Sequence, residues 1–398
     1  MRRKTMELVF KVGFSLVIGL SLLTYFLMEH QMKQMPEAEQ TELVHQVKAV
    51  VGKEMPAEPS KSSNKLISNH DRDRIHLAIV ACGDDKYLEE SLVALKSAVI
   101  LARKDLYFHI FTDDRLKPLF IEKIDTWPSR FRSKVKLTLY PITYPSYVNY
   151  DEWKRIFKMC ATQRIFLPDI LPNIDSVIYI DTDVLFMRPI DDLWDHFTKF
   201  NTTQIAALAP ESEDKATGWY NRFARHPYYG PLGVNSGVML MNLTGMRAMG
   251  WVEKMVAHFR EYKLMITWGD QDLINILFHY HPDKLYIFPC EWNYRTDHCM
   301  YMSVCRSAEK TGVMMLHGSR AAFQNDKQLA FKAVYQSFRD HPFDADLEKL
   351  LVAMEVNLES SKGTPCHKIS HIFYKKFQEY VTAGPPIQEP VVEKKKEK

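Results

Sequence analysis

The chain has 398 residues, of which 46% are hydrophobic and 12% aromatic, so it can bury one large core or two modest ones. Lys and Arg number 52 against 49 Asp and Glu, which leaves a formal net charge of +3. This near balance gives no reason to expect nucleic acid as a partner, and much of the positive surplus lies at the two ends of the chain.

The N-terminal segment predicts a membrane anchor. Residues 1–11 are basic, and the apolar run at residues 12–28 is just long enough to cross a bilayer as a helix. The alternative is a cleaved signal peptide, but this run is long for one and lacks the small residues of a cleavage site. Because basic residues stay in the cytoplasm, the rest of the chain would enter the lumen. We therefore expect a single-pass type II protein of the Golgi or endoplasmic reticulum membrane, with residues 1–11 as its cytoplasmic tail.

Composition divides the lumenal part into three. Residues 29–73 are rich in Glu, Lys, Gln, Ser and Pro, and such a segment buries too little apolar surface to fold, so we predict a stem. Residues 74–384 form the predicted catalytic domain. Residues 385–398 are a charged tail that we expect to be disordered.

Short apolar runs alternate with helical patterns in the first half of the domain. The predicted strands are residues 76–81, 107–111, 135–140 and 177–180. A helix after the first strand would place on one face Leu88, Leu92, Leu95 and Val99. A second helix, before the fourth strand, would place on one face Trp153, Ile156, Phe157 and Cys160. Strands separated by helices predict an α/β fold, with a mainly parallel sheet covered by helices on both faces.

The six cysteines and two sequons fit a secretory compartment. Cys82 and Cys160 lie in segments predicted to be buried core, and we expect free thiols there. The other four lie in the loop-rich C-terminal third and can form two bridges in three ways: Cys290, Cys299, Cys305 and Cys366. Of the two sequons, the one at Asn201 lies in a polar stretch and is the better candidate for glycosylation, because Asn242 closely follows a hydrophobic run.

Polar side chains follow several predicted strands, at the sheet edge where ligands bind in open α/β proteins. Residues 82–87 follow the first strand, residues 112–114 the second, and Asp181-Thr182-Asp183 the fourth. A late strand at residues 313–316 is followed by His317-Gly318. We expect these side chains to share one edge of the sheet.

Asp181 and Asp183 predict a metal site. Alternate residues of an extended segment point the same way, so the two carboxylates can converge on one cation. Aspartates after a strand are commonly turn or cap residues, but the apolar flanks here would bury the pair, which is costly without a cation. Carboxylates suit Mg²⁺ or Mn²⁺, and His317 as a third ligand, rather than a structural histidine, would favour Mn²⁺. Such a cation would bridge the diphosphate of a nucleotide and neutralise charge on the leaving group.

In this order and spacing the segments resemble glycosyltransferase family 8, the metal-dependent retaining family that includes glycogenin and bacterial galactosyltransferases. The resemblance covers roughly residues 75–323. It is carried by residues 81–87, 179–185, 234–240 and 269–272 and by His317-Gly318. It implies a GT-A type, Rossmann-like fold.

The resemblance also implies a role for each matching residue. Asp181, Asp183 and His317 would hold the metal. Ala81, Gly83 and Tyr87 would line the uridine pocket, with Tyr87 stacked on uracil. The remaining donor-binding positions would be Lys158, Thr182, Asn235, Ser236, Gly237 and Gly318. Asp270 and Gln271 would flank the anomeric carbon, although on their own Asp270 would predict a helix N-cap and Asn235-Ser236-Gly237 a turn.

One departure from the family pattern concerns the diphosphate. The family usually has a glycine three residues after the histidine and a lysine six residues after it, and here Arg320 and Phe323 occupy those positions. Arg320 is the candidate to supply the missing positive charge.

A finer resemblance is to the glucoside xylosyltransferases, carried by residues 219–230, 233–243, 268–272 and 290–295. It implies transfer of xylose from UDP-xylose, in α1,3 linkage, to glucose O-linked to epidermal growth factor-like repeats such as those of Notch. The alternatives are a family 8 glucosyl- or galactosyltransferase with another lumenal acceptor, a hydrolase of the UDP-sugar, and a noncatalytic type II sugar-binding receptor. The receptor is disfavoured because the complete set of donor and metal residues is present.

Overall fold

The computed structural model describes residues 73–149, 151–153 and 160–383, which belong to the compact unit Leu66–Lys398. The predicted cytoplasmic tail, anchor, C-terminal tail and nearly all of the predicted stem lie outside these residues. Within the described ranges, no helix combines the length and apolar character needed to cross a bilayer.

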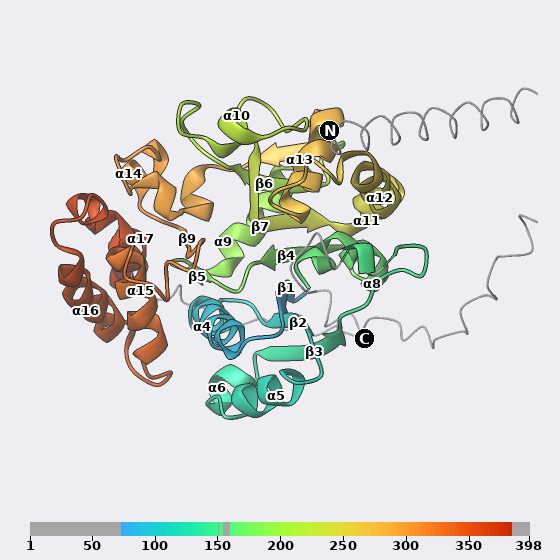
Figure 1. Cartoon of the computed structure of the whole chain (residues 1–398). Helices are drawn as coiled ribbons and strands as arrows, with labels where there is room; N and C mark the ends of the chain where they lie inside the picture. The colour runs from blue at the N-terminus through green and yellow to red at the C-terminus, as the bar shows by residue number, and fades with distance from the viewer. Residues whose placement is uncertain (1–72, 150, 154–159, 384–398) are drawn as a thin grey trace, which may run out of the picture. The chain divides into compact units, whose positions relative to one another are not determined.

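The centre of the fold is a seven-stranded sheet in the order β3-β2-β1-β4-β7-β6-β8 (Figure 1). Its strands are β1 (Ile75–Ala81), β2 (Leu106–Thr112), β3 (Val135–Pro141), β4 (Ser176–Ile180), β6 (Ala206–Pro210), β7 (Val234–Asn242) and β8 (Leu285–Ile287). Every neighbouring pair is parallel except the two that contain β7. The predicted mainly parallel sheet is therefore confirmed, and the four predicted strands correspond to β1, β2, β3 and β4.

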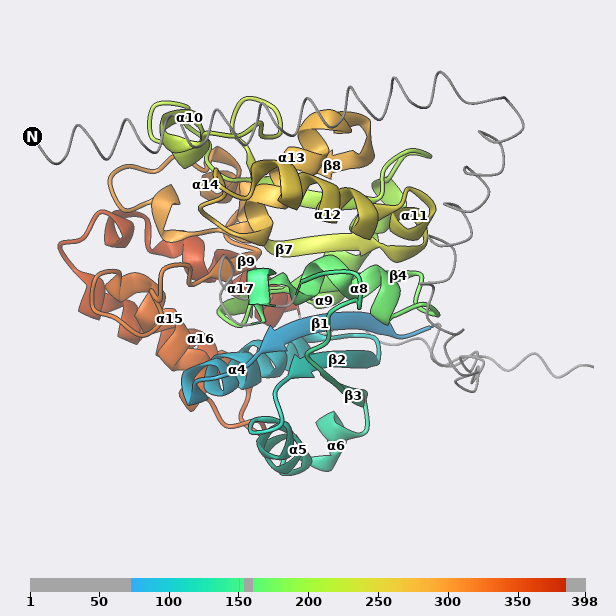
Figure 2. The same ribbon diagram turned by 45° about the vertical axis from the view of Figure 1, so that its right-hand side comes forward.

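Helices cover both faces of this sheet (Figure 2). The α-helices are α4 (Asp85–Leu101), α5 (Lys117–Asp125), α6 (Ser129–Arg132), α8 (Leu167–Ile170), α9 (Ile190–Trp194), α10 (Trp219–Phe223), α11 (Leu243–Ala248), α12 (Trp251–Tyr262), α13 (Asp270–Tyr280), α14 (Arg306–Thr311), α15 (Leu329–Asp340), α16 (Leu347–Leu358) and α17 (His371–Ala383). The 3₁₀ helices are η2 (Ala161–Phe166), η3 (Asp195–Lys199), η4 (Pro282–Lys284), η5 (Cys290–Asn293), η6 (Thr296–His298), η7 (Glu359–Ser361) and η8 (Cys366–Ile369). The last three α-helices gather at one side of the molecule, beside α14 (Figure 1).

The central strands are apolar on both faces, as expected for a sheet buried between two helical layers. In β4, Ile178 and Ile180 belong to the hydrophobic cluster that includes residues of α4, α15 and α17. The alternate residues Val177 and Tyr179 belong to a second cluster with residues of α11, α12 and α13. The same alternation runs through β1 and β7, so the sheet separates two cores.

Helix α4 forms where the apolar spacing predicts a helix. The carboxylate of Asp84 accepts a hydrogen bond from the Lys86 backbone N–H at 3.0 Å, which caps the first turn. Leu88, Leu95 and Val99 are buried on its inner face, and Leu92 packs partly buried against the same core. Of the second predicted helix, residues 154–159 lie outside the described part of the chain.

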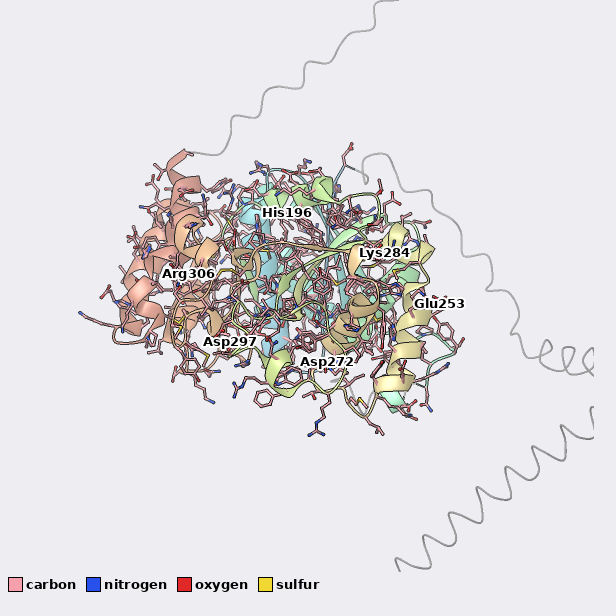
Figure 3. The ribbon with its side chains drawn as sticks, turned by 90° about the horizontal axis from the view of Figure 1, so that it is seen from above. His196, Glu253, Asp272, Lys284, Asp297 and Arg306 are labelled. Carbon is pink, nitrogen blue, oxygen red and sulfur yellow. A yellow bond between two sulfur atoms is a disulfide. The ribbon has the colours of Figure 1, made fainter. Side chains whose placement is uncertain are left out.

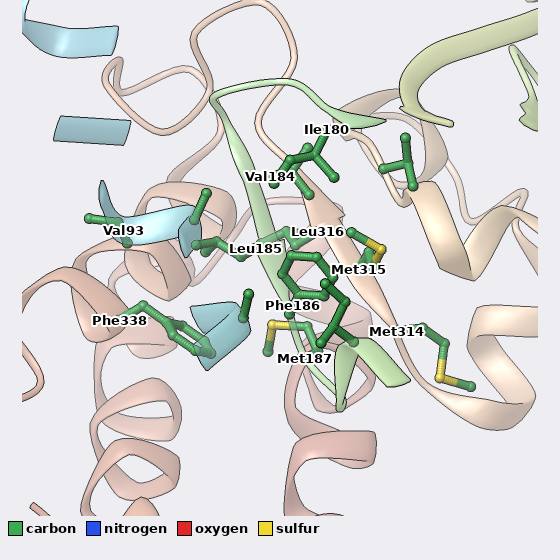
Figure 4. Packing of buried hydrophobic residues seen from close by; sticks show 14 of the residues in the cluster. Val93, Ile180, Val184, Leu185, Phe186, Met187, Met314, Met315, Leu316 and Phe338 are labelled. Carbon is green, nitrogen blue, oxygen red and sulfur yellow. The ribbon is translucent and has the colours of Figure 1, made fainter. Parts of the chain in front are cut away.

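A second, two-stranded sheet corrects the expected position of His317. β9 (Met315–His317) pairs antiparallel with β5 (Val184–Phe186), which immediately follows the Asp181–Asp183 turn, so it is not a strand of the main sheet. Both strands are fully buried, and Figure 4 shows Leu185, Phe186, Met315 and Leu316 packed together. Residue periodicity cannot distinguish a strand of a small sheet from one of a large sheet, because both are apolar when buried.

All six cysteines form disulfides: Cys82–Cys160, Cys290–Cys305 and Cys299–Cys366. The last two select one of the three connectivities that the sequence left open. The expectation of free thiols at Cys82 and Cys160 was wrong, because these two core positions lie close together, with Cα atoms 6.6 Å apart. That bridge joins the end of β1 to the residue before η2.

Candidate active site

A cavity of about 660 Å³ lies at the carboxyl ends of β1 and β4. Its lining includes Gly83 and Tyr87 from the turn and helix after β1, and Asp181, Thr182 and Asp183 from the turn after β4. This is the edge at which ligands bind in open α/β sheets, as the sequence predicted.

Asp181, Asp183 and His317 converge at this cavity. One ligand atom from each lies within 4.8 Å of the others. The Nε2 atom of His317 is 3.8 Å from Oδ2 of Asp181 and 3.4 Å from Oδ1 of Asp183. Neighbouring ligands at 2.0–2.1 Å from an octahedral cation would be roughly 3 Å apart, so a small inward movement suffices for all three to bind one ion. The donor set of two carboxylates and an imidazole therefore fits a divalent cation such as Mn²⁺ or Mg²⁺.

Backbone hydrogen bonds fix the turn that carries the two aspartates. The N–H of Asp181 donates to the carbonyl of Gly237 on β7 at 2.8 Å. The N–H of Gly318 donates to the carbonyl of Asp183 at 2.7 Å. The turn is thus held by β7 at its start and by the residue after His317 at its end, which brings all three side chains together.

The imidazole of His317 is oriented by a residue that sequence reasoning missed. Its Nδ1 lies 2.8 Å from Oδ1 of Asn293, whose Nδ2 donates to Oδ1 of Asn235 at 2.8 Å. Because Oδ1 of Asn293 can only accept a hydrogen bond, Nδ1 of His317 carries the proton and its Nε2 keeps a lone pair for a cation. Asn293 lies within residues 290–295, noted for their resemblance, but nothing in its spacing signalled this role.

Gly237 makes the close approach between β7 and His317 possible. A Cβ atom at this position would lie 2.1 Å from Cε1 of the imidazole. The glycine is therefore required by a side chain of the site itself, and its predicted approach to the donor sugar stays a prediction. Asn235 and Ser236 are fixed beside it, with the Asn235 carboxamide accepting from the Gly237 N–H at 3.0 Å.

Arg164 corrects the expectation that the two aspartates are buried and unpaired. Its guanidinium donates to Oδ1 of Asp181 at 3.0 Å, forms an ion pair with Asp270, and lies 4.4 Å from the ring centroid of Tyr179. The side chains of Asp181 and Asp183 are 29% and 18% exposed. The case for a cation therefore rests on the convergence of three ligands and not on the cost of burial. Sequence spacing gave no sign of Arg164, because its partners are distant in the chain.

Asp270 and Gln271 begin α13 but do not line the cavity. Burial, together with the charge of Asp181, raises the pKa of Asp270 to about 6 against the lowering effect of Arg164. The Oε1 atom of Gln271 accepts from the N–H of Ser236 at 3.1 Å. Asp270 is thus connected to the site through Arg164, and Gln271 through Ser236. The N-cap alternative for Asp270 was wrong, because Gly269 is the N-cap.

The expected uridine residues divide into two groups. Gly83 and Tyr87 line the cavity, and the N–H of Gly83, whose φ is 88°, donates to the Asp113 carboxylate at 2.6 Å. Ala81 is only 2% exposed and does not line the cavity. Lys158 lies outside the described residues.

Glu90 is a third polar residue of the site that the sequence did not reveal. Its carboxylate, on the buried face of α4, accepts from the Thr182 hydroxyl at 3.3 Å and from the Gln324 amide at 3.1 Å. Burial, and then the negative charge of Asp183, raises its pKa to about 7. Glu90 thus connects α4 to the turn between the two aspartates.

Arg320 lies at the mouth of this cavity, where the sequence placed a basic group. Its backbone is left-handed, with a φ of 62°, and its guanidinium pairs with Asp297 at 3.0 Å. The side chain is 52% exposed, so it can reach a bound anion. Gly318 packs closely on Phe323, because a Cβ atom at Gly318 would lie 2.7 Å from the ring of Phe323.

The two sequons differ in accessibility. Asn201 is exposed, and its carboxamide accepts from the N–H of Thr203 at 2.9 Å. Asn242 is half-buried and caps α11 by accepting from the N–H of Gly245 at 2.9 Å. The geometry favours Asn201, and glycosylation at either position stays a prediction.

Comparison with known proteins gives a consistent classification. The sequence model of glycosyl transferase family 8 matches residues 78–315. Glucoside xylosyltransferase 2 of Mus musculus is 50% identical over 316 residues, which are 76% of this chain and 70% of the relative. Glucoside xylosyltransferase 1 of Homo sapiens is 50% identical over 321 residues, which are 78% of this chain and 72% of the relative. A crystal structure of the galactosyltransferase LgtC, in complex with donor and acceptor sugar analogues, shares the fold at a TM-score of 0.50 and 18% identity, covering 67% of this chain and 98% of that one.

The fold and these matches together define a glycosyltransferase of GT-A architecture. Its candidate metal ligands lie at the ligand edge of the sheet, beside the large cavity. The chain belongs to glycosyl transferase family 8.

Proposed function

We propose that this glycosyltransferase transfers xylose from UDP-xylose to glucose O-linked to epidermal growth factor-like repeats such as those of Notch, forming an α1,3 linkage with retention of configuration. The observation that carries the proposal is the convergence of Asp181, Asp183 and His317 beside a cavity large enough for a nucleotide sugar. Support for xylose and glucose comes from the two relatives named glucoside xylosyltransferase, each 50% identical to this chain.

The metal would be Mn²⁺ or Mg²⁺, held by Asp181, Asp183 and Nε2 of His317. A bound divalent cation supplies Lewis-acid stabilisation of the negative charge that develops on the diphosphate leaving group. Asn293 keeps Nε2 available by holding the proton on Nδ1. Arg164 fixes one oxygen of Asp181, so that the other oxygen is free for the ion.

The remaining donor-site roles are proposed from the family resemblance. Tyr87 would stack on uracil, and Gly83, with Ala81 behind it, would admit the base close to the backbone. Thr182 and Arg320 would face the diphosphate, with Arg320 in place of the family's lysine. Asn235, Ser236, Gly237 and Gly318 would shape the sugar end of the donor site, and Asp270 and Gln271 would act on it through Arg164 and Ser236.

A donor screen tests this function. The purified protein is supplied with Mn²⁺, a glucosylated epidermal growth factor-like domain and, in separate reactions, UDP-xylose, UDP-glucose or UDP-galactose. Xylose transfer at the highest kcat/KM is the expected result. Preference for another UDP-sugar would instead indicate a family 8 glucosyl- or galactosyltransferase, and UDP release that does not depend on the acceptor would indicate a hydrolase. Binding without any turnover would indicate a receptor.

The proposed location is the lumen of the Golgi or endoplasmic reticulum, with residues 12–28 as a signal anchor. Three disulfides and an exposed sequon at Asn201 support an oxidising, glycosylating compartment. Protease treatment of intact microsomes should leave the catalytic domain protected, and digestion without detergent would contradict a lumenal location.

A further inference from the structure

A second cavity, of about 380 Å³, has a wall of aromatic side chains. Trp219 and Phe223 come from the first and last residues of α10, and Trp268 comes from the loop before α13. Tyr301 completes the wall from the loop after η6. Phe223, Trp268 and Tyr301 are 53%, 45% and 78% exposed, so large apolar rings face solvent where the chain could have placed polar residues.

The rings of this wall pack against one another in a defined way. The Trp219 and Trp268 rings are 5.6 Å apart between centroids and nearly perpendicular, at 76°. Trp219 also lies 6.3 Å from Phe223. Edge-to-face contact holds the rings in place and still leaves ring surface available to a ligand.

A buried carboxylate anchors both tryptophan-bearing segments. Asp272, labelled in Figure 3, has a fully buried side chain and accepts from the backbone N–H groups of Thr267 and Trp268, each at 2.7 Å. It also accepts from the hydroxyl of Tyr220, the neighbour of Trp219, at 2.8 Å. One side chain thus fixes the backbone beside both tryptophans, so the wall is preformed.

The cavity also carries polar groups suited to hydroxyls. Glu211, which is 9% exposed, lines it together with Asp214 and Asp297. Carboxylates accept hydrogen bonds from hydroxyl groups, so a ligand with several hydroxyls would find acceptors beside the aromatic wall. Arg222 and Arg320 supply donors on the same lining.

Arg320 connects the two cavities. It lines both the first cavity, with Asp183, and the second, where it pairs with Asp297 at 3.0 Å. A ligand in the second cavity therefore lies next to the part of the proposed donor site where Arg320 would face the diphosphate.

We infer that the second cavity binds the sugar ring of the acceptor, with a face of the pyranose against Trp268 and its hydroxyls toward the carboxylates. A pyranose presents C–H groups on its faces and hydroxyls around its edge, which matches an aromatic wall with acidic neighbours. This assignment rests on the proposed function, since it takes the acceptor to be a glucoside, and it goes further by naming where the glucose lies.

The test measures acceptor kinetics of the full-length protein with two acceptors, a simple alkyl glucoside and a glucosylated epidermal growth factor-like domain. The Trp268→Ala variant should raise KM for both acceptors by about tenfold or more, because it removes the stacking surface common to both. KM for UDP-xylose and the slow release of UDP without acceptor should stay unchanged. Trp268→Phe, which keeps a ring, should restore most of the acceptor affinity.

Tyr280→Ala is the matched control, because Tyr280 is an aromatic residue of similar exposure, 47%, at the opposite end of α13. It should leave both acceptor KM values unchanged. Unchanged acceptor KM in Trp268→Ala would overturn the inference. So would a loss confined to the protein acceptor, which would indicate a peptide contact, or an equal rise in KM for UDP-xylose, which would indicate a donor contact.

Failure of the proposed function is visible separately. If the wild-type protein transfers xylose to neither acceptor, the function is refuted before any variant is compared. If wild-type transfer is normal but the Trp268→Ala variant is less stable than the wild type, Trp268→Phe is the variant to compare. If Trp268→Phe loses as much acceptor affinity as Trp268→Ala, stacking on the ring is refuted.

Discussion

His317 and Asp183 are brought together by strand pairing: His317 lies opposite Val184 in the two-stranded sheet, and its Nε2 atom is 3.4 Å from the Asp183 carboxylate. His317 follows Asp183 by 134 positions in the sequence, and an antiparallel ladder of two short, fully buried strands brings the two residues together. Because the ladder fixes the register, the metal-ligand geometry depends on the packing of β5 and β9.

Replacing Asp183 by Asn should abolish transfer without unfolding the protein. The change removes one negatively charged ligand and keeps the side-chain volume. Because the metal would supply several kcal/mol of charge stabilisation, kcat/KM should fall by at least about 100-fold. The measurement is xylose transfer as a function of Mn²⁺, with circular dichroism as the folding check. Asp85→Asn, at a 75% exposed carboxylate outside the cluster, is the control and should keep full activity. Full activity of the wild type in excess EDTA would refute a metal role.

Replacing Asn293 by Ala should weaken metal binding more than it slows the reaction. Without its Oδ1 the Nδ1 proton of His317 is no longer fixed, and loss of such an outer partner typically costs 10–100-fold in metal affinity. The measurement is the Mn²⁺ concentration for half-maximal activity, which should rise, while saturating Mn²⁺ should restore much of the rate. An unchanged Mn²⁺ requirement would show that the ring is held by other contacts.

Gly237→Ala should disrupt the site because the new Cβ would lie 2.1 Å from the His317 ring. Either β7 or the imidazole must move, so we expect a stability loss of about 1–3 kcal/mol and a large loss of activity. Gly230→Ala is the comparison: nothing lies within 4 Å of that Cβ, and only its φ of +53° opposes the change, at a cost of about 1 kcal/mol. Chemical denaturation and transfer assays on both variants distinguish a steric from a conformational effect. Equal behaviour of the two alanines would count against close packing at His317.

The His226–Asp272 pair should make stability depend on pH. Burial lowers the pKa of His226, but the hydrogen bond and charge of Asp272, 3.4 Å away, raise it more, so the net shift is upward from 6.5. A raised folded-state pKa favours the protonated form, so its stabilisation is fully present below the unfolded-state value and is lost as pH rises through the folded value. Denaturant unfolding of the wild type and His226→Gln across pH 5 to 9 should show a difference that shrinks toward high pH. A difference that grows with pH would contradict this sign.

The Cys82–Cys160 bridge should be detectable as the absence of a reactive thiol. The unfolded but unreduced protein should react with no alkylating reagent, because all six cysteines are paired. Changing both Cys82 and Cys160 to Ser should lower the free energy of unfolding by about 2–5 kcal/mol. Mass spectrometry of peptides before and after reduction identifies the three pairs. Two alkylated cysteines in the unreduced protein would restore the expectation of free thiols.

The sequence was informative where local pattern determines structure. The spacing of Leu88, Leu92, Leu95 and Val99 predicted α4, and the four apolar runs predicted the strands from β1 to β4. The reversed direction of β7 was not foreseen, because a strand buried on both faces carries the same apolar residues whichever way it runs.

The site was only partly predictable for a related reason. The cluster of Asp181, Asp183 and His317 followed from strand ends and from family resemblance, and the structure brings the three together. Arg164 and Asn293 were not recognised, since each acts on partners distant in the chain that no spacing rule relates to it. Asp272 shows the same limit: as the second acidic residue of Asp270-Gln271-Asp272 it resembles a helix-terminal residue, yet it anchors both the loop that carries Trp268 and the helix that carries Trp219.

The reversal of β7 has a consequence for how such a protein can change over evolution. Because β6 ends and β7 begins at the same edge of the sheet, residues 211–233 leave and return at the ligand edge, and the N–H of Glu211 donates to the carbonyl of Gly233 at the base of this excursion. Insertions or deletions between those two residues would reshape the wall that carries Trp219 and Phe223 without shifting the register of any strand in the main sheet. If the second cavity binds the acceptor as proposed, acceptor choice can diversify in this one segment while Asp181, Asp183 and His317 keep their places.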